Sequence, residues 1–192
     1  PKSAKARQLV QRLLQKNNKD QACPPVYVRS DIIQGKGMAS SSADISVTAM
    51  ATALAMNYDL SLKELEQICL SVEPTDASFY QGVTQFDYIK GTISQPLGMC
   101  PPLKILVFDE GGSIDTVSFN QQIDLQTKIL EKESIIEESL DLFKRGLNTH
   151  DINLIGQAAT LSAFGNQRIL YKPNLYDFHD IGNYYNSVGT II

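Results

Sequence analysis

Apolar residues recur at helical spacing in the first third of the chain. In residues 3–16 they form a single stripe, which predicts an amphipathic helix. The stripe consists of Ala6, Leu9, Val10, Leu13 and Leu14. Residues 41–56 are apolar on nearly every side, so we expect a buried helix there. Ser61 and Glu64 have the S-x-x-E spacing of a capping box, which predicts a helix ending near residue 72.

Alternating apolar and polar residues predict strands elsewhere. Residues 26–33 alternate in this way, and residues 83–89 and 92–97 flank Gly91 as two further strands. Residues 104–119 are typical of two strands joined by a tight turn. The turn residues are Asp109, Glu110, Gly111 and Gly112.

After Asn120 the pattern is helical. We expect one helix over residues 125–147, a second over residues 152–166 with Asp151 as its N-cap, and a third over residues 175–188. Helices that alternate with antiparallel strands, followed by clustered helices, predict an α+β fold.

Composition narrows the class of protein. Of the 192 residues, 43% are apolar and 20% charged, which is typical of an ordinary soluble protein. The formal net charge of −4 gives no reason to expect nucleic acid or a membrane surface as a partner, and no apolar run approaches membrane-spanning length. Cys23, Cys69 and Cys100 lack metal-ligand spacing, so we expect free thiols and a cytoplasmic location.

The segment "GKGMASSSAD", residues 35–44, is the strongest chemical signal. It fits neither a Walker A loop, which needs G-x-x-x-x-G-K followed by Ser or Thr, nor the G-x-G-x-x-G dinucleotide loop, because Ser40 takes the third glycine position. Small residues before a helix nevertheless let a phosphate approach bare N–H groups and the positive helix end. Two interpretations stay open from the spacing alone: a phosphate site, or a serine-capped helix in a flexible loop.

As a phosphate site, the loop would hold ATP through eight consecutive residues. They are Gly35, Lys36, Gly37, Met38, Ala39, Ser40, Ser41 and Ser42. The serine hydroxyls would bond phosphate or Mg²⁺, an ion that takes one or two protein ligands besides phosphate oxygens and water.

The same loop resembles the P-x-x-x-G-L-G-S-S-A-A motif of the GHMP kinases. Ala39 stands for the second glycine of that motif, Ser42 for an alanine, and Ile33 or Gln34 for the proline. Two further stretches, "VEPTDASFYQGVTQFDYIKG" and "ILVFDEGG", are similar to the L-threonine kinases of cobalamin side-chain synthesis.

The resemblance implies a fold and its domains. We expect a two-layer GHMP kinase fold with a part similar to ribosomal protein S5 domain 2, residues 1–82, which binds ATP, and an incomplete ferredoxin-like part, residues 83–192. Because Pro1 leads straight into a helix and the chain stops in "SVGTII", we also expect the fold to be truncated at both ends.

The resemblance further implies roles for the loop after residue 72. Asp76 would orient or deprotonate the substrate hydroxyl, Thr75 and Asp76 would bind the substrate, and Ser41 with Glu73 would hold Mg²⁺. Taken alone, Asp76 is more typical of an Asx-turn after Pro74 than of a catalytic base. Glu64 and Glu66 are alternatives to Glu73, although both look like surface residues of a helix.

Other polar residues carry weaker signals. Lys36 would lie near the phosphates or in solvent, and Asp44 would favour the positive end of its helix or belong to the site electrostatically. One of Asp87 and Tyr88 would face the substrate. His150 and His179 are more typical of helix ends and surfaces than of catalysis.

Together these patterns predict a cytoplasmic, ATP- and Mg²⁺-dependent kinase that converts L-threonine to O-phospho-L-threonine. Alternatives are another GHMP kinase, of the homoserine or isoprenoid-precursor type, and a non-catalytic homologue that binds nucleotide or substrate. The expected partners are ATP and a small hydroxy amino acid, without nucleic acid or membrane, and a homodimer is left open.

Overall fold

The computed structural model describes residues 2–18, 22–112 and 124–191. These residues form two compact units, which meet along the chain between Pro96 and Leu97. Residues up to Pro96 form the first unit, with Gly111 and Gly112, while Leu97–Glu110 and the described residues from 124 onward form the second. The boundary expected at residues 82 and 83 concerned family domains, and that assignment stays a prediction.

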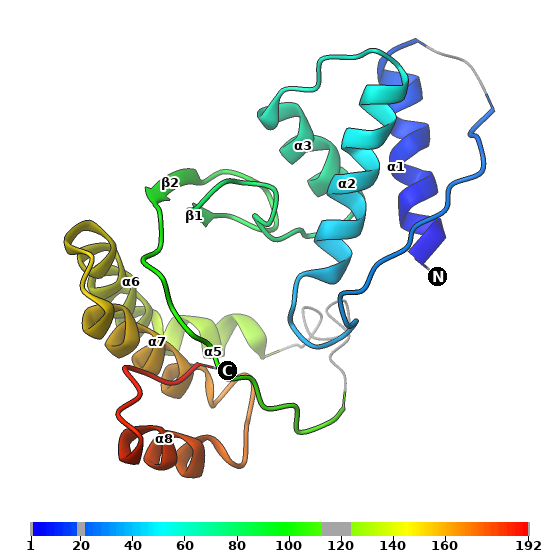
Figure 1. Ribbon diagram of the computed structural model, residues 1–192. Helices are drawn as coiled ribbons and strands as arrows, with labels where there is room; N and C mark the ends of the chain where they lie inside the picture. The colour runs from blue at the N-terminus through cyan, green and yellow to red at the C-terminus, as the bar shows by residue number, and fades with distance from the viewer. Residues whose placement is uncertain (1, 19–21, 113–123, 192) are drawn as a thin grey trace. The chain divides into compact units, whose positions relative to one another are not determined.

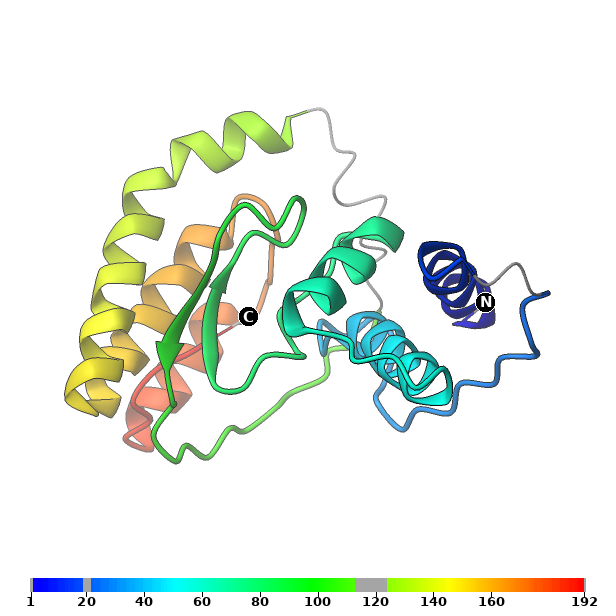
Figure 2. The ribbon, with the colours of Figure 1, turned by 90° about the horizontal axis from the view of Figure 1, so that it is seen from above.

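Three helices form the core of the first unit: α1 (Lys2–Lys16), α2 (Ser40–Ala55) and α3 (Leu62–Val72). They pack side by side, as Figures 1 and 2 both show. The predicted apolar stripe of α1 is buried in full, which confirms that prediction. Its members Leu9 and Leu13 join a cluster with residues of α2 and α3, namely Ile45, Ala49, Leu65, Ile68 and Cys69.

Helix α2 begins and ends within one residue of its predicted bounds, but it is not buried on every side. Val47, Met50 and Leu54 are exposed by more than half. The sequence could not distinguish a helix enclosed all round from one whose apolar face is left open, because both are apolar at every turn.

The capping box of α3 is confirmed. The Ser61 hydroxyl accepts a hydrogen bond from the Glu64 backbone N–H at 3.3 Å, and the Glu64 carboxylate accepts one from the Ser61 backbone N–H at 3.2 Å. Both bonds satisfy N–H groups that the helix itself leaves unpaired.

Strands β1 (Val83–Phe86) and β2 (Ser94–Gly98) pair as a two-stranded sheet, at the two places predicted. The connecting residues are too few for a parallel crossover, so the pair is a hairpin. Asp87 shapes its turn, since its carboxylate accepts hydrogen bonds from the backbone N–H groups of Ile89, Lys90 and Thr92.

The described residues of the second unit include four helices: α5 (Leu125–Glu131), α6 (Glu133–Thr149), α7 (Ile152–Asn166) and α8 (Leu175–Tyr184). Helices α6 and α7 pack along each other (Figure 2), and the buried Ser139 hydroxyl donates to the Ala158 carbonyl oxygen at 2.9 Å. Asp151 caps α7 as predicted, because its carboxylate accepts from the N–H groups of Asn153 and Leu154.

The backbone of α7 also lies very close to the backbone of the segment that follows α8. A Cβ on Gly156 would lie 1.9 Å from the Val188 carbonyl oxygen, so only glycine fits there. The segment beyond α8 is held against α7 by a hydrogen bond from the Thr190 N–H to the Thr160 hydroxyl at 2.9 Å.

Two strand predictions are wrong where the structure describes them. Residues 26–33 and 104–108 form no strand, and Ile105, Leu106 and Val107 are largely exposed. A strand needs a neighbour to complete its ladder, and alternation along the chain does not reveal whether one is present. The second half of the predicted hairpin, residues 113–119, lies outside the described residues.

Two helix predictions are wrong in part. The helix expected over residues 125–147 is interrupted at Lys132, where neither glycine nor proline marks a break. The Lys132 ammonium donates instead to the Asn166 side chain of α7, a tertiary contact that no local pattern reveals. Helix α8 ends at Tyr184, four residues before the expected position.

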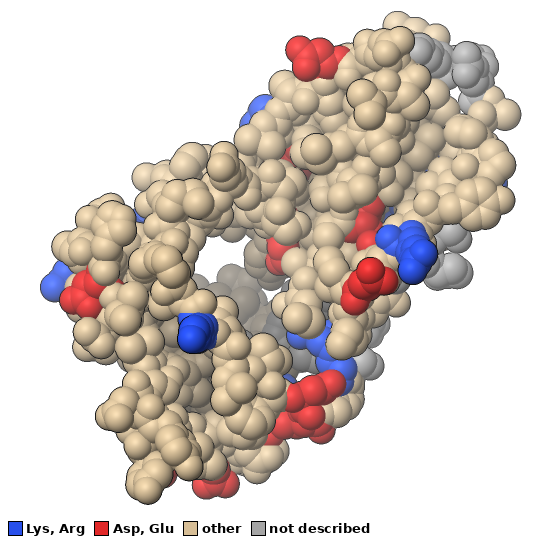
Figure 3. All heavy atoms as spheres, viewed as in Figure 1, with Lys and Arg blue, Asp and Glu red and all other residues tan. Residues whose placement is uncertain are grey.

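The observed elements are helices with one small sheet, in agreement with the α+β prediction. No helix among the described residues has the length and apolar character that crossing a bilayer requires. Lys and Arg side chains are scattered among Asp and Glu over the face in Figure 3 and gather in no single patch there.

Candidate active site

The loop before α2 has the backbone geometry that its glycines permit. Gly35 and Gly37 adopt left-handed φ angles of 70° and 68°, and Ala39 follows at 53°. A Cβ on Gly37 would meet no atom within 4 Å, so the space beside the loop is open. Ala39 is therefore the strained member, because a side chain in the left-handed region costs about 1 kcal/mol or more.

The first turn of α2 presents its N–H groups without a side-chain cap. Ala39 occupies the N-cap position and makes no capping bond, and the first turn contains no acidic residue. The uncapped N–H groups and the helix dipole contribute positive partial charge at this end of α2. Serine capping, the alternative reading of the loop, is therefore not what the structure shows.

Ser41 lies beside Glu73, the C-cap residue of α3. The Ser41 hydroxyl donates a hydrogen bond to the Glu73 carboxylate, whose side chain is only 14% exposed. The two residues expected to hold Mg²⁺ are thus brought together by the packing of α2 against α3.

Lys5 completes this cluster, and the sequence reasoning missed it. Its ammonium donates to Glu73 and lies 3.4 Å from the Ser41 hydroxyl. No local signal marks Lys5, because its carboxylate partner is 68 residues away in the sequence.

Ser42 and Asp76 form a second pair. The Ser42 hydroxyl donates to Oδ2 of Asp76 at 3.2 Å and accepts from the Asp76 backbone N–H at 2.9 Å. Ser42 is buried at 3% exposure, whereas Asp76 is exposed. The expected general base therefore lies at the N-terminal turn of α2.

The other residues predicted to bind phosphate or substrate differ in their exposure. Met38 is 52% exposed, Lys36 is half-buried and Ser40 is buried. Thr75 is 1% exposed, its N–H donates to the Tyr88 carbonyl oxygen at 2.9 Å, and its hydroxyl has no hydrogen-bond partner in the described structure.

The two alternative glutamates have structural partners. Glu64 bonds Lys16, Tyr58 and Ser61, and these hydrogen bonds lower its pKa from 4.5 to about 2. The Glu66 side chain is 1% exposed; burial opposes its ionisation, but hydrogen bonds from Lys63 and Tyr80 outweigh burial and lower the pKa. Both glutamates fasten α3 to its neighbours; Glu66 is buried and not the surface residue expected, whereas Glu64 keeps 28% of its side chain exposed.

The other polar residues that the sequence singled out occupy helix ends or make hydrogen bonds within the fold. Asp87 is engaged by the hairpin turn, where hydrogen bonds from Thr92, Lys90 and Ile89 lower its pKa to about 2. His150 is the exposed C-cap of α6, and His179 bonds Thr190 and Asn183. The Glu110 carboxylate accepts a hydrogen bond from Asn174 at 2.6 Å.

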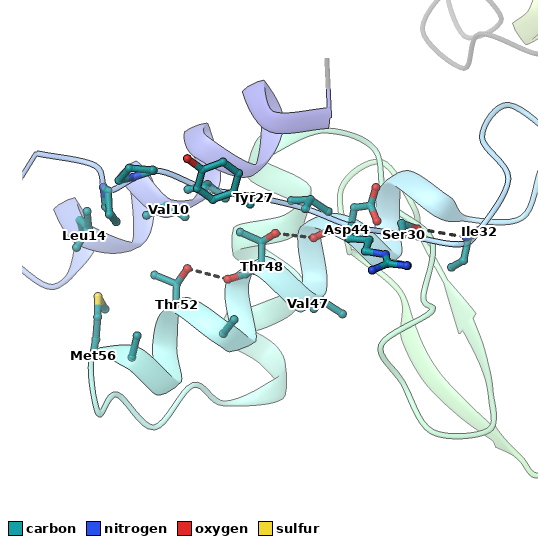
Figure 4. Close-up of a pocket in the computed structure, with 18 of the residues that line it drawn as sticks. Val10, Leu14, Tyr27, Ser30, Ile32, Asp44, Val47, Thr48, Thr52 and Met56 are labelled. Carbon is teal, nitrogen blue, oxygen red and sulfur yellow. Dashed lines mark hydrogen bonds between the residues drawn. The ribbon is translucent and has the colours of Figure 1, made fainter.

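A groove of about 710 Å³ runs along the other face of α2. Figure 4 shows Val47, Thr48 and Thr52 of α2 on one side and Val10, Leu14 and Tyr27 on the other. Thr48 and Thr52 donate to carbonyl oxygens of their own helix, at Asp44 and Thr48. The hydroxyls of these two threonines are thus already hydrogen-bonded within α2.

The oxygen atoms of Ser41 and Glu73 are suitable ligands for Mg²⁺. This ion binds few protein ligands when phosphate oxygens and water fill its other coordination positions. In the described part of the chain, no three His, Cys, Asp or Glu residues are grouped so as to hold a metal ion by themselves. Cys23, Cys69 and Cys100 are free, and burial raises the pKa of the Cys69 thiol to about 12.

A glycine-bearing loop, an uncapped helix start and two carboxylates bonded to the first helical turn thus lie together at the start of α2. Residues 4–82 match the family described as GHMP kinases N terminal domain, which confirms the resemblance for this part of the chain. More particularly, the chain is 34% identical to the L-threonine kinase of Salmonella typhimurium over 148 residues, 77% of this chain and 49% of that protein. It is 30% identical to the L-threonine kinase of Citrobacter freundii over 149 residues, 78% of this chain and 51% of that protein.

The chain thus spans about half the length of the curated relatives it matches. No solved structure matches it.

Proposed function

We propose that the full-length protein is an ATP-dependent kinase that phosphorylates the side-chain hydroxyl of L-threonine, as part of cobalamin biosynthesis. The observation that carries this proposal is the position of Asp76 at the start of α2, fixed by two hydrogen bonds to Ser42. A carboxylate beside an electropositive helix start combines a proton acceptor with a phosphate site. The names of the two relatives support the choice of threonine.

The triphosphate of ATP would lie in the loop of residues 35–41. Open space beside Gly37 allows a phosphate to approach the backbone, and the N–H groups at the start of α2 would donate to its oxygens. Lys36, on the same loop, and Lys5, beside Ser41, add positive charge near the phosphates. The more extended family fold, with parts similar to ribosomal protein S5 and ferredoxin, belongs to this proposal.

Ser41 and Glu73 would hold Mg²⁺ through one hydroxyl and one carboxylate oxygen. The ion would supply charge neutralisation for the phosphate oxygens. The Lys5 ammonium contacts the same carboxylate, and this ion pair supports the proposal that a cation binds there.

The transfer step uses Asp76. Its carboxylate accepts the proton of the threonine hydroxyl as the hydroxyl oxygen bonds the γ-phosphorus of ATP, and the bond from that phosphorus to the bridging oxygen breaks, releasing ADP. Thr75 would contact the amino acid, since a buried hydroxyl without a partner calls for a ligand or a water.

The test is ADP release by the full-length protein with ATP, Mg²⁺ and a panel of threonine, serine, homoserine and mevalonate. We expect turnover to be highest with threonine and Asp76→Asn to lower kcat by about 10²-fold or more, while ATP binding by calorimetry persists. The exposed Asp59 offers a matched control, because Asp59→Asn makes the same change on another loop.

Other outcomes identify the alternatives. Preference for homoserine or mevalonate would indicate another GHMP kinase, and binding of ATP without turnover would indicate a sensor. No binding of ATP would mean that the loop serves the fold alone.

A further inference from the structure

Ser42 differs from its serine neighbours in what its hydroxyl contacts. It lies on the side of α2 that faces the core, near Ile45 and Ala49, and only 3% of it is exposed. From there its hydroxyl reaches across to the loop after α3, where it bonds both the backbone and the side chain of Asp76.

We propose that Ser42 is a positioning residue for Asp76 and not the phosphate ligand that the sequence indicates. This inference rests on the proposed function, which gives Asp76 its role. A serine hydroxyl has one proton, and here that proton is directed to Oδ2 of Asp76. Phosphate oxygens only accept hydrogen bonds, so Ser42 has no donor left for them while it holds Asp76.

Asp76 needs such a contact because of where it lies. It is exposed and belongs to an irregular segment, so neither burial nor a helix fixes its side chain. One buried hydroxyl that bonds the N–H and the carboxylate together fixes the position and the direction of the carboxylate at once. A base must lie within hydrogen-bond distance of the proton it accepts, and small displacements slow the reaction strongly.

Each of the two adjacent serines thus contacts a different carboxylate. Ser41 contacts Glu73 and Ser42 contacts Asp76, so that the first turn of α2 fastens both ends of a four-residue segment. Direct contact with phosphate is left to the loop backbone and to the N–H groups of the helix.

The experiment compares Ser42→Ala with Ser46→Ala in the full-length protein. Ser46 is the matched control, because it is also buried on α2 and its hydroxyl bonds only the Ala43 carbonyl oxygen of the same helix. We expect Ser42→Ala to lower kcat at least about tenfold with the KM for ATP within about twofold of the wild type. Ser46→Ala should change neither, and Ser42→Thr, which keeps the hydroxyl, should recover most of the kcat.

A second measurement does not depend on activity. Amide hydrogen exchange at Asp76 should accelerate at least about tenfold in Ser42→Ala, since the acceptor of that N–H is lost, whereas the Thr75 N–H, bonded to Tyr88, should exchange as before. Because this measurement uses only the alanine variants, it still tests the proposal if Ser42→Thr does not fold around its added methyl group.

Two results would overturn the proposal: a KM for ATP raised tenfold with kcat unchanged, which would make Ser42 a phosphate ligand, or equal exchange at Asp76 in both alanine variants. If the wild type phosphorylates no hydroxyl compound, the proposed function fails by itself. Faster exchange at Asp76 in Ser42→Ala would then still establish that Ser42 holds this residue.

Discussion

The Ser41 hydroxyl donates a hydrogen bond to the Glu73 carboxylate, although the two residues are 32 positions apart and lie on different helices. Ser41 belongs to the first turn of α2 and Glu73 to the end of α3, where a carboxylate is unfavourable against the helix dipole. The cost of that position is offset by the Lys5 ammonium and the Ser41 hydroxyl, which both contact the same carboxylate.

Glu73→Gln tests whether this carboxylate binds Mg²⁺. The amide keeps the size of the side chain and an oxygen, but loses the charge that attracts the ion. We expect the Mg²⁺ concentration for half-maximal activity to rise at least about tenfold, in line with the losses that changes around metals commonly cause. Titration of the kinase rate with Mg²⁺ measures this shift.

Glu64→Gln is the control, since Glu64 bonds Lys16 and Ser61 at the other end of α3. Its Mg²⁺ dependence should equal that of the wild type. An unchanged Mg²⁺ dependence in Glu73→Gln would remove Glu73 from the metal site.

Ala39→Gly should stabilise the protein. Ala39 has φ 53° and ψ 27°, a left-handed conformation that glycine adopts without steric cost. We expect the free energy of unfolding to rise by about 1 kcal/mol, measured by urea denaturation. Ala51→Gly, at an exposed position inside the same helix, should instead lower it by about 1 kcal/mol. A loss of stability in both variants would contradict the strain at Ala39.

The Glu64 contacts predict a pH dependence of stability. Hydrogen bonds from Lys16, Tyr58 and Ser61 lower the pKa of Glu64 from 4.5 to about 2 in the folded state. A lowered pKa means that the contribution is complete above about pH 4.5 and is lost as the pH falls toward 2. Urea midpoints between pH 5 and pH 2 should therefore fall less steeply in Glu64→Gln than in the wild type.

The exposed Glu137 of α6 gives the control for that titration. Glu137→Gln should keep the wild-type slope. Equal slopes in all three proteins would show that the Glu64 contacts do not persist in solution.

Gly91→Ala should destabilise the hairpin. Gly91 has φ +65°, and an added Cβ would lie 2.6 Å from Cδ1 of Leu70 and 2.9 Å from Oε1 of Glu66. Cδ1 is the end of the flexible Leu70 side chain, but the Glu66 carboxylate is held by Lys63 and Tyr80. We expect a loss of about 2–4 kcal/mol in the free energy of unfolding, from backbone strain and overpacking together.

Gly111→Ala separates these two causes. Gly111 has φ +86°, and its added Cβ would meet nothing within 4 Å, so that strain of about 1 kcal/mol should act alone. The same loss in both variants, in urea denaturation, would mean that Glu66 yields to the methyl group.

The sequence by itself determined the features that depend on neighbouring residues. The capping bonds of Ser61 and Asp151 placed the starts of α3 and α7, and the apolar stripe of α1 identified its buried face. These succeed because a cap and a helical stripe involve residues only a few positions apart.

Tertiary structure decided the rest, because the partners are distant in the sequence. Residues 26–33 alternate like a strand yet pair with no described segment, and the helix breaks at Lys132, whose side chain contacts Asn166 of another helix. The candidate site shows the same division. The loop before α2 is recognisable locally, but the contacts of Ser41 with Glu73, of Ser42 with Asp76 and of Lys5 with Glu73 exist only because three helices pack together.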